Sequence, residues 1–577
     1  MTRSPADLKA LPIAVAAPVE PRLHRELPPL VVLAALLALA CCGHFVKPHG
    51  DFYEFRETGH ALLRGELPPT FKRAPVFPLL VAAAGTLLGT ILTTQTPPDQ
   101  LAASWINAAL LPCNVALTYL IGRRWFGAGS RWTATWVALL PVGLYCTAHV
   151  LVEPLLVGMI LLTIWLAGRG SRWAYLTAAL ASMTRYDAAG LLIGVALADL
   201  LGRQRLRVAV TRTALALTPL VLWLALTALT WETRSEDHYL RQIGERWQFE
   251  VAWPLDATFR CVFGPETLPV PVWLADWEPW LRGGTRWGIV VAAVLGGGVL
   301  LWRRDRAVLG SLTLFVGYIL VHAVFPFRSG FERFGYPPAP LVILAAGVGV
   351  HFLARWVSGS IQSGAVRGLL LLVVALPLLI LAYGEASRLR ALLSLPRQWL
   401  TSLPVFALAG VTLVWVTSWR GRSNVAGRIV GYLALCLLAL VHLRQALPLL
   451  GDGRERINDV GAARWIRANT GPEEGVLTDS PGLLRLYADD RAPQRFVGLG
   501  GIVAESWPAI LAECRRRGIC YIIWHDQVFA EQGAYYIRKW RLERFAVLAN
   551  PEAAPGLVVE MRYEERPTLW ILRVLPE

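Results

Sequence analysis

Apolar runs of about 17 to 23 residues with few charges recur along the chain, and they limit its fold more than any other feature. About 20 apolar residues in a helix cross the hydrocarbon core of a bilayer. Charged residues make up only 17% of the 577 residues. We therefore predict an all-α polytopic membrane domain. Thirteen spans are expected near 28–46, 100–122, 130–150, 153–168, 172–184, 187–202, 208–230, 286–302, 307–327, 336–356, 367–387, 399–419 and 427–449.

Basic residues are concentrated in alternate loops of this scheme. If the N-terminus is cytoplasmic, the inside segments hold 21 basic and 4 acidic residues, or +17, while the whole chain carries +15. This matches the positive-inside rule, so no nucleic-acid partner is expected. The arm 1–27 is then cytoplasmic, and the long loops 47–99 and 231–286 lie outside. We interpret the apolar stretch 74–92 as a helix that lies in or dips into the outer leaflet.

The composition changes after about Leu450, at the end of the transmembrane domain 28–449. Short apolar runs such as GVLTD and CYIIW alternate with helical patterns such as WPAILAECRRRG. This alternation is typical of strands and helices in a small α/β domain. With thirteen crossings, the domain 450–577 is predicted to be extracytoplasmic.

Candidate catalytic residues begin in the first outer loop. Asp51 and its neighbour Tyr53 follow the first span directly. A carboxylate at that position can accept a proton from a nucleophile, hold a metal ion or remain a solvated charge.

Ionisable residues also lie at the ends of later spans. His149 and Glu153 fall in a short turn at the membrane boundary, where charge is costly and indicates a function or a snorkelling pair. Thr184, Arg185 and Asp187 lie between two short apolar halves. A guanidinium there can bind a phosphate in bidentate fashion, or form an internal ion pair that stabilises the turn.

The loop between the ninth and tenth spans reads FPFRSGFERFGYPP. Arg328, Arg333 and Tyr336 in this loop could clamp a phosphate or diphosphate, or belong to an ordinary interfacial loop with an aromatic belt. A Gly-rich phosphate loop, an HExxH motif and paired CxxC motifs are missing from the sequence, which disfavours a nucleotide-consuming enzyme or pump.

In their order along the chain, these segments resemble the C-type (GT-C) integral-membrane glycosyltransferases. The similar group includes the lipid A aminoarabinose transferase, the protein O-mannosyltransferases and the rhizobial lipopolysaccharide-core transferases. The resemblance implies transfer of a hexosyl or pentosyl group, with inversion, from a polyprenyl-phosphate donor. The acceptor would be a lipid, polysaccharide or protein on the extracytoplasmic side of a bacterial inner membrane. The motifs that carry the resemblance are the first-loop Asp, PVFPLL, GRRWFG, an acidic residue before a Leu-rich helix, Thr-Arg and ERFGYPP.

The resemblance also implies roles for individual residues. Asp51 would be the general base, and Glu153 would be the second acidic residue of the site. The residues that would meet the donor phosphate are Arg185, Arg333 and Arg328. The residues that would support the site are Tyr53, His149, Thr184, Asp187 and Tyr336. Phe52 stands where the family often has a second acid, which speaks against a divalent metal, the one cofactor that the resemblance leaves open.

Two other functions remain as alternatives. A flippase or transporter of lipid-linked sugars would need charges near the membrane midplane and a repeat between its halves. A polysaccharide ligase or polymerase would favour a large outer loop rich in Arg and His.

Overall fold

A computed structural model defines the fold of two compact units. They comprise Met1–Cys42, Asn107–Thr147 and Val152–Leu449 in the first, and Gly43–Ile106, Ala148–Leu151 and Leu450–Glu577 in the second. The residues that the structure describes are 26–43, 45, 47–68, 73–92, 96–229, 258, 261–262, 278–303, 305–324, 332–360, 442, 446, 456–488, 495–528, 537, 541–564 and 568–576.

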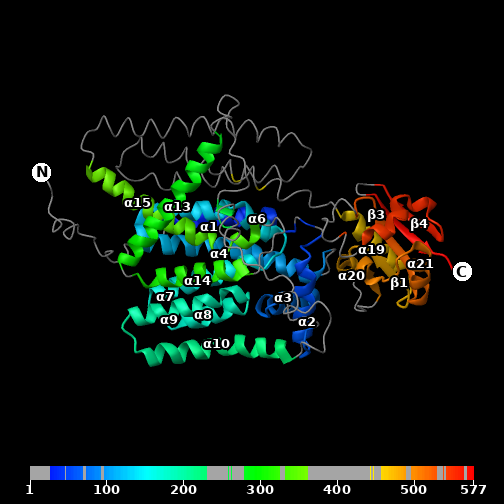
Figure 1. Cartoon of the computed structure of the whole chain (residues 1–577), viewed down its shortest axis with the longest axis horizontal. Coiled ribbons are helices and arrows are strands. Elements are labelled where there is room, and N and C mark those ends of the chain that lie inside the picture. The colour runs from blue at the N-terminus through cyan, green and yellow to red at the C-terminus, as the bar shows by residue number, and fades with distance from the viewer. Residues whose placement is uncertain are drawn as a thin grey trace. The chain divides into compact units, whose positions relative to one another are not determined.

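The first unit is helical (Figure 1). Helix α14 packs against α9 and α7, α10 packs against α8 and α9, and α13 packs against α15. The helices of this unit are α1 (Leu27–Cys41), α4 (Pro98–Phe126, from Asn107 onward), α5 (Ser130–Leu139), α6 (Pro141–Ala148), α7 (Glu153–Gly168), α8 (Trp173–Ser182), α9 (Gly190–Leu201), α10 (Leu206–Leu229), α13 (Glu278–Trp302), α14 (Arg306–Val324) and α15 (Ala339–Ser360).

The apolar runs predict these helices well. The run 153–168 coincides with α7, whose first two residues, an acid and a proline, suit a helix start. Pro141 divides the run 130–150 into α5 and α6. The runs from 367 to 449 and most of loop 231–286 lie outside the described residues. Among those described, α4 and α10 are long and apolar enough to cross a membrane by length and composition.

Small residues let α13 and α15 approach backbone to backbone. A Cβ on Gly296 would overlap the carbonyl oxygen of Ala345, and a Cβ on Gly349 would overlap that of Ala292. Such reciprocal contacts through small residues are how helices pack in a membrane, where lipid removes the hydrophobic drive for association.

The second unit contains a five-stranded sheet of order β2-β1-β3-β5-β4. Strand β1 (Gly475–Thr478) pairs in parallel with β2 (Phe496–Gly498) and β3 (Ile519–His525). Strand β5 (Leu569–Val574) pairs antiparallel with β3 and with β4 (Leu557–Tyr563). The flanking helices are α19 (Ile457–Asn469), α20 (Pro481–Ala488) and α21 (Trp507–Arg516).

Each face of this sheet has its own core. Along β3, Ile522 and Trp524 pack into one hydrophobic cluster, and Tyr521 and Ile523 pack into the other. This is the two-residue alternation of a strand buried on both faces. The expectation of a mostly helical chain with a small C-terminal sheet is therefore confirmed.

The segment 47–99, which the sequence predicts as the first outer loop, belongs to the same unit as the sheet. It forms α2 (Asp51–Leu63) and α3 (Val76–Ile91), which pack on each other. The contact is close because a Cβ on Gly59 would overlap the carbonyl oxygen of Pro78. The stretch 74–92 thus forms a helix of 16 residues, shorter than a full crossing requires.

Candidate functional site

Asp51 is the first residue of α2, and Arg73 holds its carboxylate. Arg73 Nη2 lies 2.5 Å from Asp51 Oδ1, and Arg73 Nε lies 2.5 Å from Glu54 Oε2. The two acids share one helix face because they are three residues apart. Burial would lower the pKa of Arg73, but the two carboxylates outweigh it and raise that pKa. Arg73 therefore stays charged, and it orients Asp51.

His149 lies in the same unit and packs on the segment that precedes α2. Its ring stacks on Phe45 with 3.5 Å between centroids, and its carbonyl accepts a bond from the His49 N–H at 3.4 Å. The next residue, Val150, has a φ of 53°. A β-branched residue in the left-handed region costs about 1–3 kcal/mol, and such strain persists where the surroundings impose it.

In the helical unit, Arg185 bridges two acids. Its Nη1 lies 3.0 Å from Glu153 Oε1, and its Nη2 lies 2.8 Å from Asp187 Oδ2. Glu153 is 1% exposed, and its Oε2 is buried with no hydrogen-bond partner among the described residues. The ion pair considered from the sequence, Arg185 with Asp187, is present, and Glu153 extends it to a triad. We name Glu153, Arg185 and Asp187 the arginine triad.

A second arginine, Arg333, contacts the same aromatic ring as Arg185 of the arginine triad. Arg185 Cζ lies 5.3 Å and Arg333 Cζ 4.8 Å from the centroid of the Phe334 ring. Both distances are in the range of cation–π contacts. The segment 332–338 (ERFGYPP) and the segment of Thr184 and Arg185 therefore contact the same ring. An anion site built from both segments would require such proximity. Arg328 lies outside the described residues.

Two of the residues predicted to support the site serve packing. The Thr184 hydroxyl donates to the Leu180 carbonyl at 2.7 Å, which ties it to its own helix. Tyr336 is fully buried, and its hydroxyl lies over Gly143 of α6, where an added Cβ would be 3.0 Å away. Tyr53 lies in the second unit.

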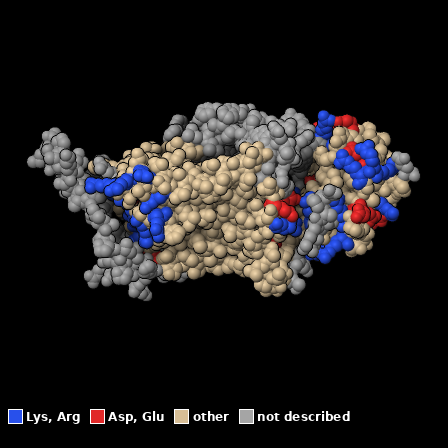
Figure 2. Space-filling model, turned by 90° about the horizontal axis from the view of Figure 1, so that it is seen from below, with Lys and Arg blue, Asp and Glu red and all other residues tan. Residues whose placement is uncertain are grey.

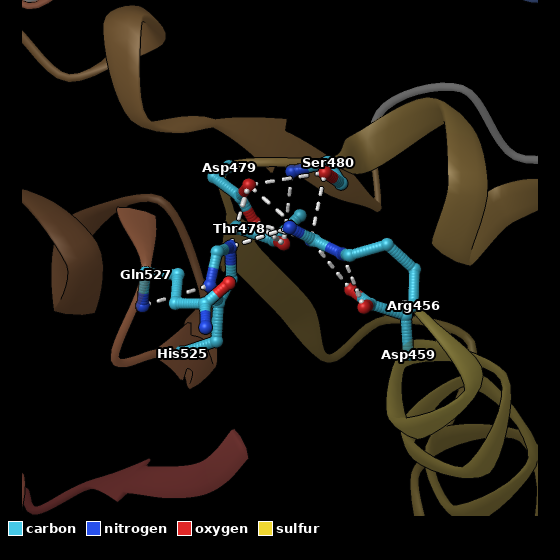
Figure 3. Close-up of polar contacts among 7 residues, drawn as sticks. All are labelled: Arg456, Asp459, Thr478, Asp479, Ser480, His525 and Gln527. Carbon is cyan, nitrogen blue, oxygen red and sulfur yellow. Dashed lines mark hydrogen bonds and ion pairs between the residues drawn. The ribbon is translucent and has the colours of Figure 1, made fainter. Parts of the chain in front are cut away.

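A buried charge cluster in the second unit was not predicted from the sequence (Figure 3). Arg456 Nε lies 2.6 Å from Asp459 Oδ2, and its Nη2 lies 3.2 Å from Asp479 Oδ1. His525 Nε2 lies 2.5 Å from Arg456 Nη1 and 3.1 Å from Asp479 Oδ2. The Ser480 hydroxyl accepts a bond from Arg456 at 3.0 Å. We name these five residues the Arg456 cluster.

The Arg456 cluster lies at the carboxyl ends of β1 and β3. Asp479 follows β1 directly, and His525 ends β3. Because β2 and β3 flank β1 on opposite sides, this is the switch point where open α/β sheets bind ligands. Here the guanidinium of the chain's own Arg456 fills that position. The acidic residue after the run GVLT was the available signal in the sequence.

Helix α20, which follows β1, contacts α2. A Cβ on Gly482 of α20 would lie 2.6 Å from Cγ of Tyr53, so the tyrosine ring lies directly on the glycine. Arg485 Nη1 lies 2.5 Å from Glu57 Oε1. Burial raises the pKa of Tyr53 well above its usual value, and nearby Tyr487 adds to the shift. The C-terminal sheet therefore fixes α2, the helix that begins with Asp51.

Adding one methyl group at Gly482 tests this contact. Gly482→Ala is expected to lower the unfolding temperature, because overpacking of a rigid ring costs about 1–3 kcal/mol. Tyr53→Ala in the same chain should remove the overlap, so the double variant should lose less than the sum of the two single variants. Gly498→Ala is the control, since its added Cβ would meet only the ring of Pro481, at an ordinary 3.6 Å. Additive losses in a thermal melt would contradict the contact.

The Arg456 cluster makes stability depend on pH in a defined direction. Burial would raise the pKa of Asp479, but Arg456, His525 and Lys47 outweigh it and hold that pKa well below its usual value. A depressed carboxyl pKa stabilises the fold above the unfolded value of about 3.9, and this contribution is lost as the pH falls below it. The unfolding temperature should therefore fall between about pH 5 and pH 3.

In Asp479→Asn, the unfolding temperature should be lower at neutral pH and should vary less over the acidic window. The exposed Asp526, in the turn after β3, offers a matched control, and Asp526→Asn should keep the wild-type slope. Unfolding is monitored by tryptophan fluorescence. If the unfolding temperature changes with pH equally in wild type and in Asp479→Asn, Asp479 is not the titrating group.

Clusters of three or more His, Cys, Asp or Glu side chains that could hold a metal ion do not occur within the described part of the chain. The carboxylates near Asp51 and Arg185 are each engaged by a guanidinium instead. Arg73 and Arg185 each engage two carboxylates.

Over nearly its whole length, the structure is similar to solved C-type glycosyltransferases, which confirms the fold that the motifs indicate. ArnT from Cupriavidus metallidurans, the lipid A aminoarabinose transferase, matches in the apo state with a TM-score of 0.54 and 14% identity, over 95% of this chain and 98% of that chain. The same protein bound to undecaprenyl phosphate matches with a TM-score of 0.56 and 15% identity, over the same shares. AglB, the archaeal oligosaccharyltransferase from Archaeoglobus fulgidus, matches with a TM-score of 0.48 and 12% identity, over 94% of this chain and 73% of that chain. No protein-family model and no curated protein matches the sequence.

Proposed function

We propose that this chain is an integral membrane glycosyltransferase that transfers a sugar from a polyprenyl-phosphate donor to an acceptor on the extracytoplasmic side. The observation that carries the proposal is the arginine triad and its neighbour Arg333. Two guanidiniums meet at one ring in a helical unit whose fold is shared with ArnT, and ArnT has been solved with undecaprenyl phosphate. A guanidinium matches the oxygens of a phosphate in number and geometry.

The donor phosphate is the natural ligand of the two arginines. When the bond between the sugar carbon and the phosphate oxygen breaks, the leaving polyprenyl phosphate keeps the electron pair and gains one negative charge. A fixed guanidinium that faces this oxygen stabilises the transition state more than the ground state. Arg185 is preorganised for this role because Glu153 and Asp187 fix its orientation.

The two carboxylates also determine what charge the site must add to bind an anionic donor. One guanidinium between two acids leaves a net negative charge in the arginine triad, so an anionic donor needs a second cation. Arg333, whose Cζ lies 4.8 Å from the centroid of the same Phe334 ring, supplies it. Glu153 and Asp187 keep Arg185 oriented while the donor phosphate binds.

Asp51 is the proposed general base. It accepts the proton of the acceptor hydroxyl or amine as that atom attacks the sugar carbon opposite the phosphate, which inverts the configuration. Its contact with Arg73 orients it. By holding α2 through Gly482 and Arg485, the C-terminal sheet has the role of positioning this base.

Purified protein in liposomes tests the function directly. With a labelled undecaprenyl-phosphate sugar and an envelope lipid or polysaccharide extract, the label should move to the acceptor while undecaprenyl phosphate is released in equal amount. Label that crosses the bilayer while still attached to its lipid would instead indicate a flippase. Label transferred only from a diphosphate-linked glycan would indicate a ligase or polymerase.

A further inference from the structure

The turns at one end of the helical unit lie together and are rich in arginine. Arg303, after α13, donates to the carbonyl of Trp125 at the end of α4, at 3.3 Å. The Arg306 guanidinium lies where a Cβ on Gly202 would be 2.6 Å from its Cζ and one on Gly170 would be 2.9 Å from its Nη1. Figure 2 shows Lys and Arg side chains gathered at one end of the helices. These are turns that the positive-inside rule assigns to the inner side.

An apolar groove of about 470 Å³ opens among these turns. Its volume is in the range of about 300–1,000 Å³ that small-molecule sites span. Aliphatic side chains form most of the wall, which offers little hydrogen bonding and suits a hydrocarbon chain. The lining residues are Leu197, Leu200, Leu201, Leu301, Asp305, Val308 and Leu309.

Exposed cations follow the lining leucines of α9 directly. Arg203 and Arg205 come two and four residues after Leu201, and both are exposed without an ion pair in the described part of the chain. Arg212, by contrast, pairs with Asp199 at 3.0 Å. Asp305, the acid in the groove lining, is already engaged: its Oδ1 accepts the Ala307 N–H at 2.8 Å, and its Oδ2 lies 3.6 Å from Arg124 Nε. The segment that follows the leucines of the groove wall along the chain therefore carries exposed positive charge.

The backbone at Arg203 is also unusual. Its φ is 62°, a conformation that favours glycine at the end of a helix. Its N–H donates to the carbonyl of Leu200 at 2.9 Å, which closes α9. An arginine thus occupies a position where a glycine would close the helix with less strain, two residues beyond Leu201 of the groove wall.

We propose that this groove binds an anionic phospholipid, with one acyl chain along the leucines and the phosphate at Arg203 and Arg205. Charge complementarity selects this occupant, because basic pockets at the inner face of membrane helices attract anionic headgroups. The site rests on the membrane location proposed above and does not depend on the transfer chemistry. The transferase could fail its assay and the lipid site still be present.

Native mass spectrometry of the full chain in detergent measures the binding. Phosphatidylglycerol should bind at least about tenfold more tightly than phosphatidylcholine of the same acyl length. Glycerol phosphate alone should not displace it, since the acyl chain supplies the contact with the groove. Equal affinity for the two lipids, or displacement by glycerol phosphate, would overturn the proposal.

Two double variants distinguish lipid binding at the groove from a general electrostatic attraction to this end of the helical unit. Arg203→Gln with Arg205→Gln should weaken phosphatidylglycerol binding about tenfold or more. Arg169→Gln with Arg172→Gln removes the same charge from the exposed turn before α8 and should change the affinity less than twofold. Equal losses in the two variants would show a diffuse electrostatic effect and would also overturn the site.

Discussion

Asp51→Asn should abolish sugar transfer while the protein stays folded and inserted. The amide cannot accept the acceptor proton, and general-base catalysis contributes about 10²–10⁴-fold to a rate. We therefore expect kcat with a labelled polyprenyl-phosphate sugar to fall by at least about 10². Because Asp51 starts α2 and contacts Arg73, the thermal melt must be followed in the same preparation.

Glu54→Gln is the matched control for this variant. It removes the other carboxylate on Arg73 and lies one turn further along the same helix. If Asp51 acts as the base, Glu54→Gln should retain most of the turnover, although both variants weaken the hold on Arg73. Similar losses in the two variants would reassign Asp51 from proton transfer to the positioning of Arg73.

Arg185→Lys is expected to weaken donor binding by more than about tenfold. The net charge of the arginine triad stays the same. Lysine keeps the positive charge between Glu153 and Asp187 but cannot form two parallel bonds to a phosphate. Arg185→Ala is less informative, because it leaves buried carboxylates unpaired, and breaking such a pair costs about 3–5 kcal/mol. Donor saturation curves for Arg185→Lys and wild type that coincide would remove Arg185 from the phosphate site.

A compensated variant distinguishes stability from chemistry at the same position. Arg185→Gln combined with Glu153→Gln removes one cation and one carboxylate, so the net charge of the arginine triad is unchanged. Its unfolding temperature should lie closer to wild type than that of Arg185→Gln alone, while donor use stays lost. Recovery of donor use in this double variant would mean that the arginine triad is only structural.

The sequence predicts the helices because hydrophobic length is a local property. The run that became α7 has the same first and last residues in the structure. Boundaries shift where the sequence is less apolar, as in α13, which begins at Glu278 in EPWLRGGTRW, eight residues before the predicted span. In that segment the backbone stays helical although four of its ten residues, Glu278, Arg282, Thr285 and Arg286, are charged or polar.

The pairing of charges was harder to predict, because partners lie far apart in the chain. Arg73 is 22 residues from Asp51, and Arg185 is 32 residues from Glu153. A motif indicates which residue types are needed for the chemistry, but a contact between two loops depends on how their helices pack. The motif order did indicate that the segment with Arg333 belongs with that of Arg185, and both contact the ring of Phe334.

The Arg456 cluster shows a different limit. Asp479 follows the apolar strand β1 and His525 ends the apolar strand β3, so their place at one edge of the sheet could have been predicted from the pattern. The position of Arg456, which precedes α19, could not be predicted in this way. No spacing rule links it to His525, which is 69 residues away.

Binding of undecaprenyl phosphate to the purified chain tests the central claim most directly, since it requires neither the sugar nor the acceptor to be known. We predict saturable binding to the wild type, and binding weaker by at least about tenfold to Arg185→Lys in the same detergent. Equal binding to both proteins, or no binding to the wild type, would contradict the assignment of the arginine triad as the donor phosphate site.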